Sequence, residues 1–225
     1  MEGYIADKQA MMVEEAELDT VHQWYLPHHA VFKRSNPEKC RVVFDCAAQY
    51  KGVSLNDVIL QGPNFLNNLS GVLVRFRKEP VAVVGDIKLM FHQCFVLESD
   101  RRFLRFLWWP NGDTTQKPRV YCMKVHLFGG KSSPSVVNFC MRQIADDNEG
   151  SFSELSIDTL RRSFYMDDMI RSVSCTAEAK QLIVEMKDLL KAGGFELAKF
   201  MSTSRAVIES VPEEERAKSL QNMDL

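Results

Sequence analysis

Two adjacent carboxylates at a predicted turn constrain this chain more than any other feature. Asp167 and Asp168 lie between two apolar runs, so the segment 164–173 is predicted to form a strand, a turn and a second strand. Asp86 ends a separate apolar run at 80–87. If the fold brings these three carboxylates together, they form an all-oxygen site for hard divalent cations such as Mg²⁺, which suits phosphoryl transfer.

The net charge narrows the kinds of nucleic-acid contact that the chain can make. Of its 225 residues, 45% are hydrophobic and 26% are charged, which is ordinary for a globular protein. The formal net charge is −2, whereas a self-sufficient nucleic-acid binder usually carries a basic excess. A dedicated RNA-binding module is disfavoured because the sequence has no basic stripe with interleaved aromatic residues. A local basic patch, or parts of a longer chain, would have to hold any duplex.

Cysteine, histidine and apolar patterns indicate an intracellular protein. The six cysteines are scattered without a Cys-x-x-Cys pair, and the five histidines have no cysteine partners at zinc-site spacing. The amino terminus lacks the basic start and apolar stretch of a signal peptide, and no uncharged apolar run reaches about 18 residues. We expect a reducing environment, with the cytoplasm as the location, and no membrane span.

Periodicity and turn residues predict an α+β fold in which helices back an antiparallel sheet. The run 80–87 is almost continuously apolar, as expected of a strand covered on both faces. Gly193-Gly194 is predicted to end the third helix with a left-handed cap. The predicted elements are strands at 40–46, 80–87, 103–109, 119–125 and 195–200, a strand pair at 164–173, and helices through 66–76, from 133 and at 176–191.

A series of short motifs resembles the fingers and palm region of a reverse transcriptase, and most resembles that of BEL/Pao-type long-terminal-repeat retrotransposons. The resemblance covers roughly residues 24–205, and it rests on the order and spacing of motifs that are individually weak. The motifs are Leu26-Pro27-His28-His29-Ala30-Val31, Arg41-Val42-Val43-Phe44-Asp45, Ser54-Leu55-Asn56-Asp57, Gly62-Pro63, Asp86 with Phe91 and Gln93, Arg105-Phe106-Leu107-Trp108, Phe128-Gly129 with Ser133-Pro134, Phe164-Tyr165-Met166-Asp167-Asp168, and Gly194-Phe195-Glu196-Leu197-Ala198-Lys199.

The resemblance implies a domain layout. Residues 1–24 form a peripheral segment, 25–205 a fingers/palm domain with partial fingers and a palm-like antiparallel sheet, and 206–225 a polar tail. No thumb or primer-gripping segment is recognisable, so we expect the chain to work as part of a larger polyprotein with thumb, ribonuclease H and integrase domains.

The resemblance makes Asp86, Asp167 and Asp168 the catalytic and metal-binding carboxylates. Asp86 and Asp167 would hold two Mg²⁺ ions, with Mn²⁺ as an alternative, and Asp168 would support the site. The alternative for the adjacent pair is a solvated hairpin turn, where aspartate is common.

Phe91, Phe128 and Gly129 are implied to shape the nucleotide pocket. An aromatic ring at Phe91 would collide with a 2′-hydroxyl and so select deoxynucleotides. Phe128-Gly129 resembles the segment that packs against the nascent base pair, with glycine allowing close backbone approach. The alternatives are a core phenylalanine at Phe91 and an ordinary loop before a helix at Phe128-Gly129.

Three cations complete the predicted substrate site. Lys33 and Arg41 are candidates for contacts to the triphosphate, because ammonium and guanidinium groups bind phosphate oxygens. Lys199 resembles a palm lysine proposed to help protonate the leaving pyrophosphate. For Lys33 and Lys199 the alternative is an ordinary solvated side chain.

Two functions follow. The first is an RNA-directed DNA polymerase that adds deoxynucleotides to a primer 3′-hydroxyl, with an RNA or DNA template-primer, deoxynucleoside triphosphates and the remaining polyprotein domains as partners and no membrane. The second is an inactive, truncated retroelement remnant that acts at most as an interaction module. The intact Asp86, Asp167, Asp168, Phe91 and Arg41 favour the first.

Overall fold

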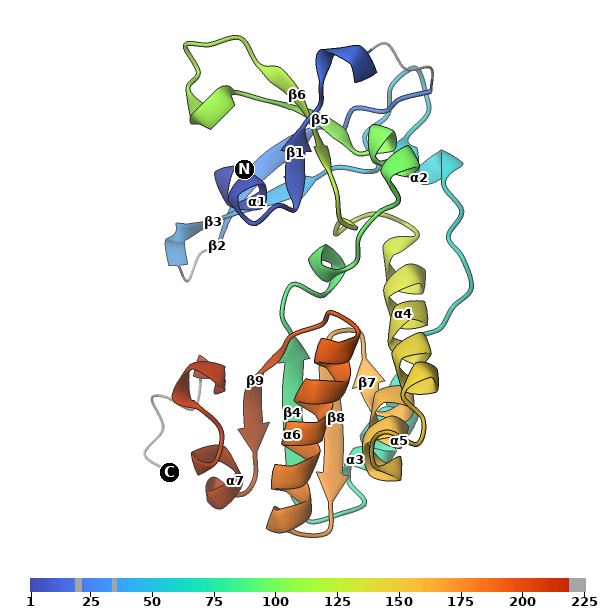
Figure 1. Cartoon of the computed structure of the whole chain (residues 1–225), viewed down its shortest axis with the longest axis vertical. Coiled ribbons are helices and arrows are strands. Elements are labelled where there is room, and N and C mark those ends of the chain that lie inside the picture. Colours follow the sequence, from blue (N-terminus) through green and yellow to red (C-terminus); the bar gives the residue numbers. More distant parts are fainter. Residues whose placement is uncertain (19–21, 34–35, 219–225) are drawn as a thin grey trace. The chain divides into compact units, whose positions relative to one another are not determined.

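The computed structural model describes residues 1–18, 22–33 and 36–218, with side chains omitted for 33–39. Within it the chain folds into two compact units (Figure 1). Unit 1 comprises Met1–Gly62 and Phe91–Ser133, and unit 2 comprises Pro63–Met90 and Pro134–Leu225. The chain therefore leaves unit 1, builds part of unit 2, returns, and then completes unit 2.

Unit 1 is built on two antiparallel sheets. One has three strands in the order β1-β6-β5, and the other is the β2-β3 hairpin. The loop between β5 and β6 contains Asn111 and Gly112, both with positive φ, the conformation that Asn-Gly steps favour in tight turns. The elements are α1 (Glu2–Ala6), β1 (Ala10–Met12), β2 (His28–Lys33), β3 (Asn36–Phe44), α2 (Leu55–Val58), β5 (Arg105–Trp108) and β6 (Arg119–Met123), with short 3₁₀ turns at Glu15–Glu17, Met90–Gln93, Glu98–Phe103 and Pro110–Gly112.

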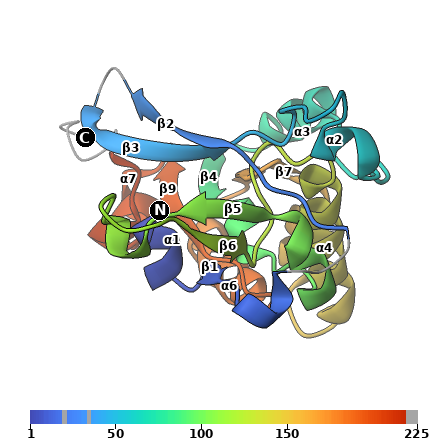
Figure 2. The same ribbon diagram turned by 90° about the horizontal axis from the view of Figure 1, so that it is seen from above.

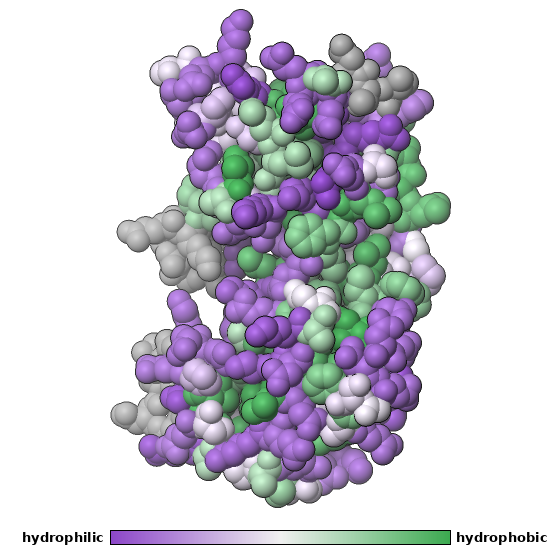
Figure 3. All heavy atoms as spheres, in the orientation of Figure 1, coloured by the Kyte–Doolittle hydropathy of each residue, from purple (hydrophilic) through white to green (hydrophobic). Residues whose placement is uncertain are grey.

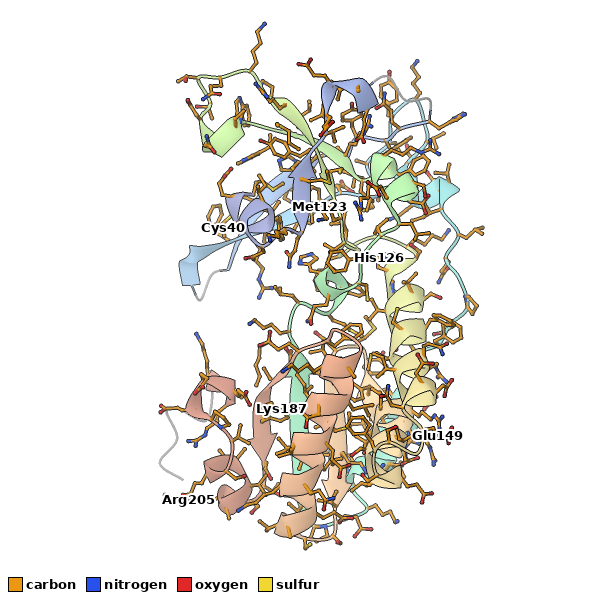
Figure 4. The ribbon with its side chains drawn as sticks, in the orientation of Figure 1. Cys40, Met123, His126, Glu149, Lys187 and Arg205 are labelled. Carbon is orange, nitrogen blue, oxygen red and sulfur yellow. The ribbon has the colours of Figure 1, made fainter. Side chains whose placement is uncertain are left out.

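Aromatic rings fill the core of unit 1. Phe106 is fully buried, and its ring centroid lies 5.2 Å from that of Phe44 and 5.8 Å from that of Tyr121. Met123, labelled in Figure 4, is also fully buried in this cluster. Offset or edge-to-face contacts of this kind add to the hydrophobic stabilisation of the sheets.

The amino-terminal segment, predicted to be peripheral, contributes to the unit 1 sheet. Strand β1 pairs with β6, Ala10 lying opposite Met123, and both Ala10 and Val13 are buried. Three residues of an acidic, weakly patterned segment complete the edge of a sheet because their partner strand supplies the hydrogen bonds. Periodicity within the segment itself carries no such signal.

Unit 2 is an antiparallel sheet backed by helices, as the sequence predicts. The sheet has the order β7-β8-β4-β9, and every neighbouring pair is antiparallel. Its elements are α3 (Leu69–Phe76), β4 (Val81–Ile87), α4 (Ser133–Asp147), α5 (Glu154–Arg162), β7 (Phe164–Tyr165), β8 (Asp168–Val173), α6 (Thr176–Ala192), β9 (Leu197–Ser202), α7 (Arg205–Glu209) and a 3₁₀ turn at Glu213–Glu215.

The two faces of the unit 2 sheet are covered unequally. Helix α6 packs on one face of β4, β8 and β9, and α3 lies on the other face, against β8 and β7 (Figures 1 and 2). On β4, Val83, Gly85 and Ile87 are buried, while Val84 and Asp86 are only partly buried. In the described residues, β4 is therefore covered fully on one face and only partly on the face of Asp86, which differs from the predicted cover on both faces. Hydrophilic residues predominate over unit 2 on the face drawn in Figure 3.

Several element boundaries differ from the predictions. Helix α3 begins only at Leu69, where Asn68 caps it by accepting a hydrogen bond from the Gly71 amide. Helix α5 is not predicted at all, since it is short and polar; its cap, Ser153, also donates to Glu185 on α6. Strand β2 is a further element that the sequence analysis does not predict.

The predicted polar tail is partly packed in the described residues up to 218. Val207, Ile208 and Val211 are buried, and Lys187 of α6 (Figure 4) forms an ion pair of 2.6 Å with Glu215. Residues 219–225 lie outside the described part of the chain. All six cysteines are described and none forms a disulfide. No helix in the described residues is long and apolar enough to cross a bilayer.

Replacing Gly85 by valine should destabilise unit 2. A Cβ at Gly85 would lie 3.2 Å from Phe200 Cε1 and 3.3 Å from Leu197 Cδ1, and overpacking of this kind costs about 1–3 kcal/mol. Urea denaturation followed by circular dichroism measures the loss. Ala82→Val, on the more open face of the same strand, is the matched control, and an equal loss in both variants would contradict the packing argument.

Asp158→Asn should lower the free energy of unfolding by about 1 kcal/mol at pH 7. Burial alone would raise the pKa of Asp158, but the hydrogen bond and charge of Arg171, 2.7 Å away, and those of Arg162 outweigh it and lower the pKa. A carboxyl group whose pKa is lowered by folding stabilises the fold at pH values above its pKa in the unfolded chain. This stability is lost as the pH falls through the folded pKa.

The unfolding free energies of wild type and Asp158→Asn should therefore converge below about pH 4. Glu209→Gln, which breaks the exposed pair of Glu209 with Arg205, is the control and should change stability little. A difference between wild type and Asp158→Asn that stays constant down to pH 3 would refute the ionic origin of the effect.

Candidate active site

The pairing of β4 with β8 places two of the predicted carboxylates directly opposite each other. In this register Val84 lies opposite Ile170, and Asp86 lies opposite Asp168. Directly opposed residues have Cα atoms about 4.5–5.5 Å apart and side chains on the same face of the sheet. Asp86 and Asp168 therefore meet on the face that α6 does not cover.

The turn between β7 and β8 brings in the third carboxylate. Tyr165 pairs with Asp168, so Met166 and Asp167 form the tip of the hairpin. Met166 has φ +54°, a left-handed conformation that residues other than glycine rarely adopt. The Ile87 amide donates to the Asp167 carbonyl oxygen at 2.8 Å, which ties the tip to the end of β4. The three predicted aspartates thus lie together at one end of the unit 2 sheet.

Lys199 reaches this cluster from β9, on the other side of β4. Its Nζ lies 2.5 Å from Oδ1 of Asp86. The register between β4 and β9 shifts here, so that Lys199 and Phe200 stand opposite Gly85 alone, as in a β-bulge. Lys199 has φ +56°, which is strained for a lysine. The bulge directs the lysine at Asp86.

Like charges dominate the electrostatics of the site. Although Asp168 is exposed as a residue, partial burial of its carboxyl raises the pKa, and the negative charges of Asp167 and Asp86 raise it further. The nearby charge of Lys199 opposes this shift. Repulsion among the three carboxylates is therefore only partly relieved by the protein itself.

The donor set fits a hard divalent cation, although it is not arranged as a cage. All the candidate ligands are carboxylate oxygens, the type that Mg²⁺ and Mn²⁺ prefer. A cation would also relieve the repulsion that raises the pKa of Asp168. In the described residues, however, no group of three His, Cys, Asp or Glu side chains is placed so that it could hold a metal ion. The metal assignment of Asp86, Asp167 and Asp168 stays a prediction.

The predicted nucleotide-pocket residues belong to unit 1, where two of them touch. Phe91 is buried and packs edge-to-face on Phe128, with ring centroids 4.6 Å apart. Phe128 is 51% exposed, so about half of its surface remains accessible to solvent. Gly129 has φ +92°, a conformation that glycine adopts without strain. The core alternative for Phe91 and a pocket role are both compatible with this packing.

Arg41 and Lys33 lie on the β2-β3 hairpin of unit 1. Arg41 is exposed on β3, opposite Val31 of β2. Lys33 is the last residue of β2, and its side chain lies outside the described part of the chain. Their roles as triphosphate ligands remain predictions.

Asn56 is a site residue that the sequence analysis does not single out. Its Nδ2 donates to the Gly129 carbonyl oxygen at 2.9 Å, and its Oδ1 accepts from the Lys131 amide at 2.9 Å. One side chain thereby fixes both ends of the loop that follows Phe128. Asn56 falls inside a motif of the resemblance, Ser54-Leu55-Asn56-Asp57, but only its long-range contacts reveal the two hydrogen bonds to this loop.

Comparisons with known proteins bear on the fold. Neither the protein-family models nor the curated proteins gave a match. Among solved structures, the foamy viral protease-reverse transcriptase in complex with double-stranded DNA matches with a TM-score of 0.60, 14% identity and coverage of 86% of this chain and 28% of its own. The native prototype foamy virus protease-reverse transcriptase matches with a TM-score of 0.59, 17% identity and coverage of 88% and 22%.

The chain has a reverse transcriptase-like fold. At these identities the likeness establishes the fold alone, because one fold hosts many functions. The chain spans roughly a quarter of the length of either structure. The BEL/Pao subtype stays a prediction.

Asn56→Ala should loosen the loop that follows Phe128. Amide hydrogen exchange measured by mass spectrometry should show faster exchange in 128–131, because two hydrogen bonds worth about 1 kcal/mol each are lost. Asn56→Asp retains the acceptor for the Lys131 amide but loses the donor to Gly129. It should keep that amide protected, so equal exchange in both variants would contradict the proposed clamp.

Proposed function

We propose that this chain is the fingers and palm part of an RNA-directed DNA polymerase, encoded by a BEL/Pao-type retrotransposon as part of a longer polyprotein. The observation that carries the proposal is the convergence of Asp86, Asp167 and Asp168 at one end of an antiparallel sheet, in a chain with a reverse transcriptase-like fold. Neither the convergence of the aspartates nor the fold is sufficient alone, since acidic turns are common and a fold does not determine a function.

In this proposal the aspartates hold two Mg²⁺ ions, or Mn²⁺ in their place. When bound, these ions activate the primer 3′-hydroxyl and stabilise the charge that develops on the triphosphate. Asp86 and Asp167 supply the ligands, the first from a strand end and the second from a turn that is hydrogen-bonded to that strand end. Asp168, opposite Asp86, supports the site by adding negative charge beside both.

The residues of unit 1 would select and position the deoxynucleoside triphosphate. Phe91, supported by the ring of Phe128, is the proposed steric filter against a 2′-hydroxyl. Arg41 and Lys33 are the proposed triphosphate contacts, and Gly129 is proposed to let the backbone approach the nascent base pair. Lys199 is proposed to help protonate the leaving pyrophosphate.

The proposed partners are an RNA or DNA template with its primer, and the other domains of the polyprotein. One of the similar structures contains double-stranded DNA, which is consistent with nucleic-acid binding by this fold. The near-neutral charge of the chain suggests that thumb and ribonuclease H domains contribute much of the template-primer affinity.

Primer extension on an RNA template with Mg²⁺ tests the proposal. The chain should incorporate deoxynucleotides but not ribonucleotides, and Asp167→Asn should reduce the rate by at least about 100-fold, because a metal ligand is lost. Asp188→Asn, which changes an exposed carboxylate of α6, is the matched control and should retain the rate.

The result that would contradict the proposal is specific. A folded chain that binds template-primer, yet extends no primer at any Mg²⁺ or Mn²⁺ concentration, would not be a polymerase on its own. That outcome would favour the second function, a non-catalytic interaction module.

A further inference from the structure

We propose that Lys199 is a built-in counter-ion for Asp86, which a divalent cation must displace in order to bind. The inference rests on the proposed function, because it takes the three aspartates as the cation site. It assigns Lys199 a role in the metal-free state, before any substrate is present.

The distance between the two groups makes simultaneous occupancy unfavourable. Lys199 Nζ lies 2.5 Å from Asp86 Oδ1, so the two groups form a direct, charge-assisted ion pair. A Mg²⁺ ion bound to the same oxygen would sit about 2.0–2.1 Å from it and would take the same lone pairs. Two cations on one carboxylate oxygen repel each other strongly, so binding of the ion is an exchange.

The backbone aims Lys199 at the carboxylate. Two residues of β9 stand opposite Gly85, and Lys199 accepts a left-handed φ of +56° in this bulge. The bulge packs the Phe200 ring into the space that Gly85 leaves by lacking a side chain. A strained lysine held by core packing differs from a surface lysine that happens to pass near an acid.

A second lysine–carboxylate pair, just beyond the ends of the same two strands, shows the contrast. Lys88 lies 3.2 Å from Glu196, and both side chains are more than half exposed. In the Lys199 pair the lysine is equally exposed, at 59%, but Asp86 is only 24% exposed, so the two pairs differ in the burial of the acid. Partial burial of the acid weakens solvent screening, so Lys199 and Asp86 should attract each other more strongly than Lys88 and Glu196 do.

The ammonium of Lys199 lies where the three carboxylates converge. The charge of Lys199 acts on Asp168 as well as on Asp86. Arrival of a divalent cation would free the ammonium beside the site, where it could then meet a phosphate. Lys199 would thus become available for catalysis only once the metal is bound.

Mn²⁺ binding, measured by electron paramagnetic resonance of the free ion, tests this inference without any turnover. Lys199→Met keeps the hydrocarbon stem and removes the charge, and it should bind Mn²⁺ about three- to fivefold more tightly than wild type, since an ion pair worth up to about 1 kcal/mol no longer competes. Lys88→Met removes an equal charge two residues from Asp86, and it should stay within about twofold of wild type.

Amine labelling gives a second readout. Acetylation of Lys199, followed by mass spectrometry, should increase when Mg²⁺ is added to wild type, because the ion pair no longer shields the amine. Labelling of Lys88 should not change. The same increase should appear without Mg²⁺ in Asp86→Asn.

The outcomes separate the two proposals. Equal or weaker Mn²⁺ affinity in Lys199→Met, or an equal gain in Lys88→Met, would overturn the counter-ion role and leave the proposed function standing. If wild type and Lys199→Met bind no more Mn²⁺ than Asp167→Asn does, both the counter-ion role and the proposed function are overturned.

Discussion

The register of β4 against β8 is the constraint on which the rest of the site depends. Because side chains alternate along a strand, a slip by one residue would turn Asp86 toward α6 and would move the buried Val83 and Ile87 away from the core. The burial of the apolar side chains of β4 therefore determines the face to which Asp86 points. The hydrophobic packing of α6 on this sheet determines where the carboxylates lie, although no residue of α6 belongs to the candidate site.

The acidic end of the sheet works against stability, and the surrounding structure compensates. Directly opposed like charges destabilise a strand pair, and two residues beside the aspartates, Met166 and Lys199, hold left-handed conformations that cost energy. The buried residues of α6 and the ring of Phe200 supply the packing that holds these positions in place. Strain concentrated at one end of an otherwise regular sheet is typical of functional sites.

Local pattern predicted the elements that pack through their own apolar residues. The strand that carries Asp86, the hairpin that carries Asp167 and Asp168 and the long helix after it were all recognisable, because their periodicity matches their burial. Elements that are held mainly by contacts with other elements of the fold were not recognisable from the sequence. Strand β1 is held by its pairing with β6, and helix α5 begins at a polar cap. The partial exposure of one face of β4 depends on which elements pack there.

The same distinction applies to the candidate site. The three aspartates were identifiable from turn and strand positions, and the structure brings them together. The contact of Lys199 with Asp86 depends on a β-bulge. The hydrogen bonds of Asn56 depend on a loop that is distant from it in sequence. No local pattern encodes a register shift or a long-range hydrogen bond, so neither contact can be predicted from the sequence.

The discontinuous make-up of both units has a consequence for biosynthesis. Strand β4 emerges from the ribosome long before β8 and β9, which flank it in the finished sheet. Until those strands are made, β4 is an apolar strand with two unpaired edges. At that stage unit 1 still lacks β5 and β6. Such non-local pairing folds slowly and exposes aggregation-prone edges. The nascent chain therefore depends on late synthesis to protect its early strands, and a premature stop before β8 would leave a fragment prone to self-association.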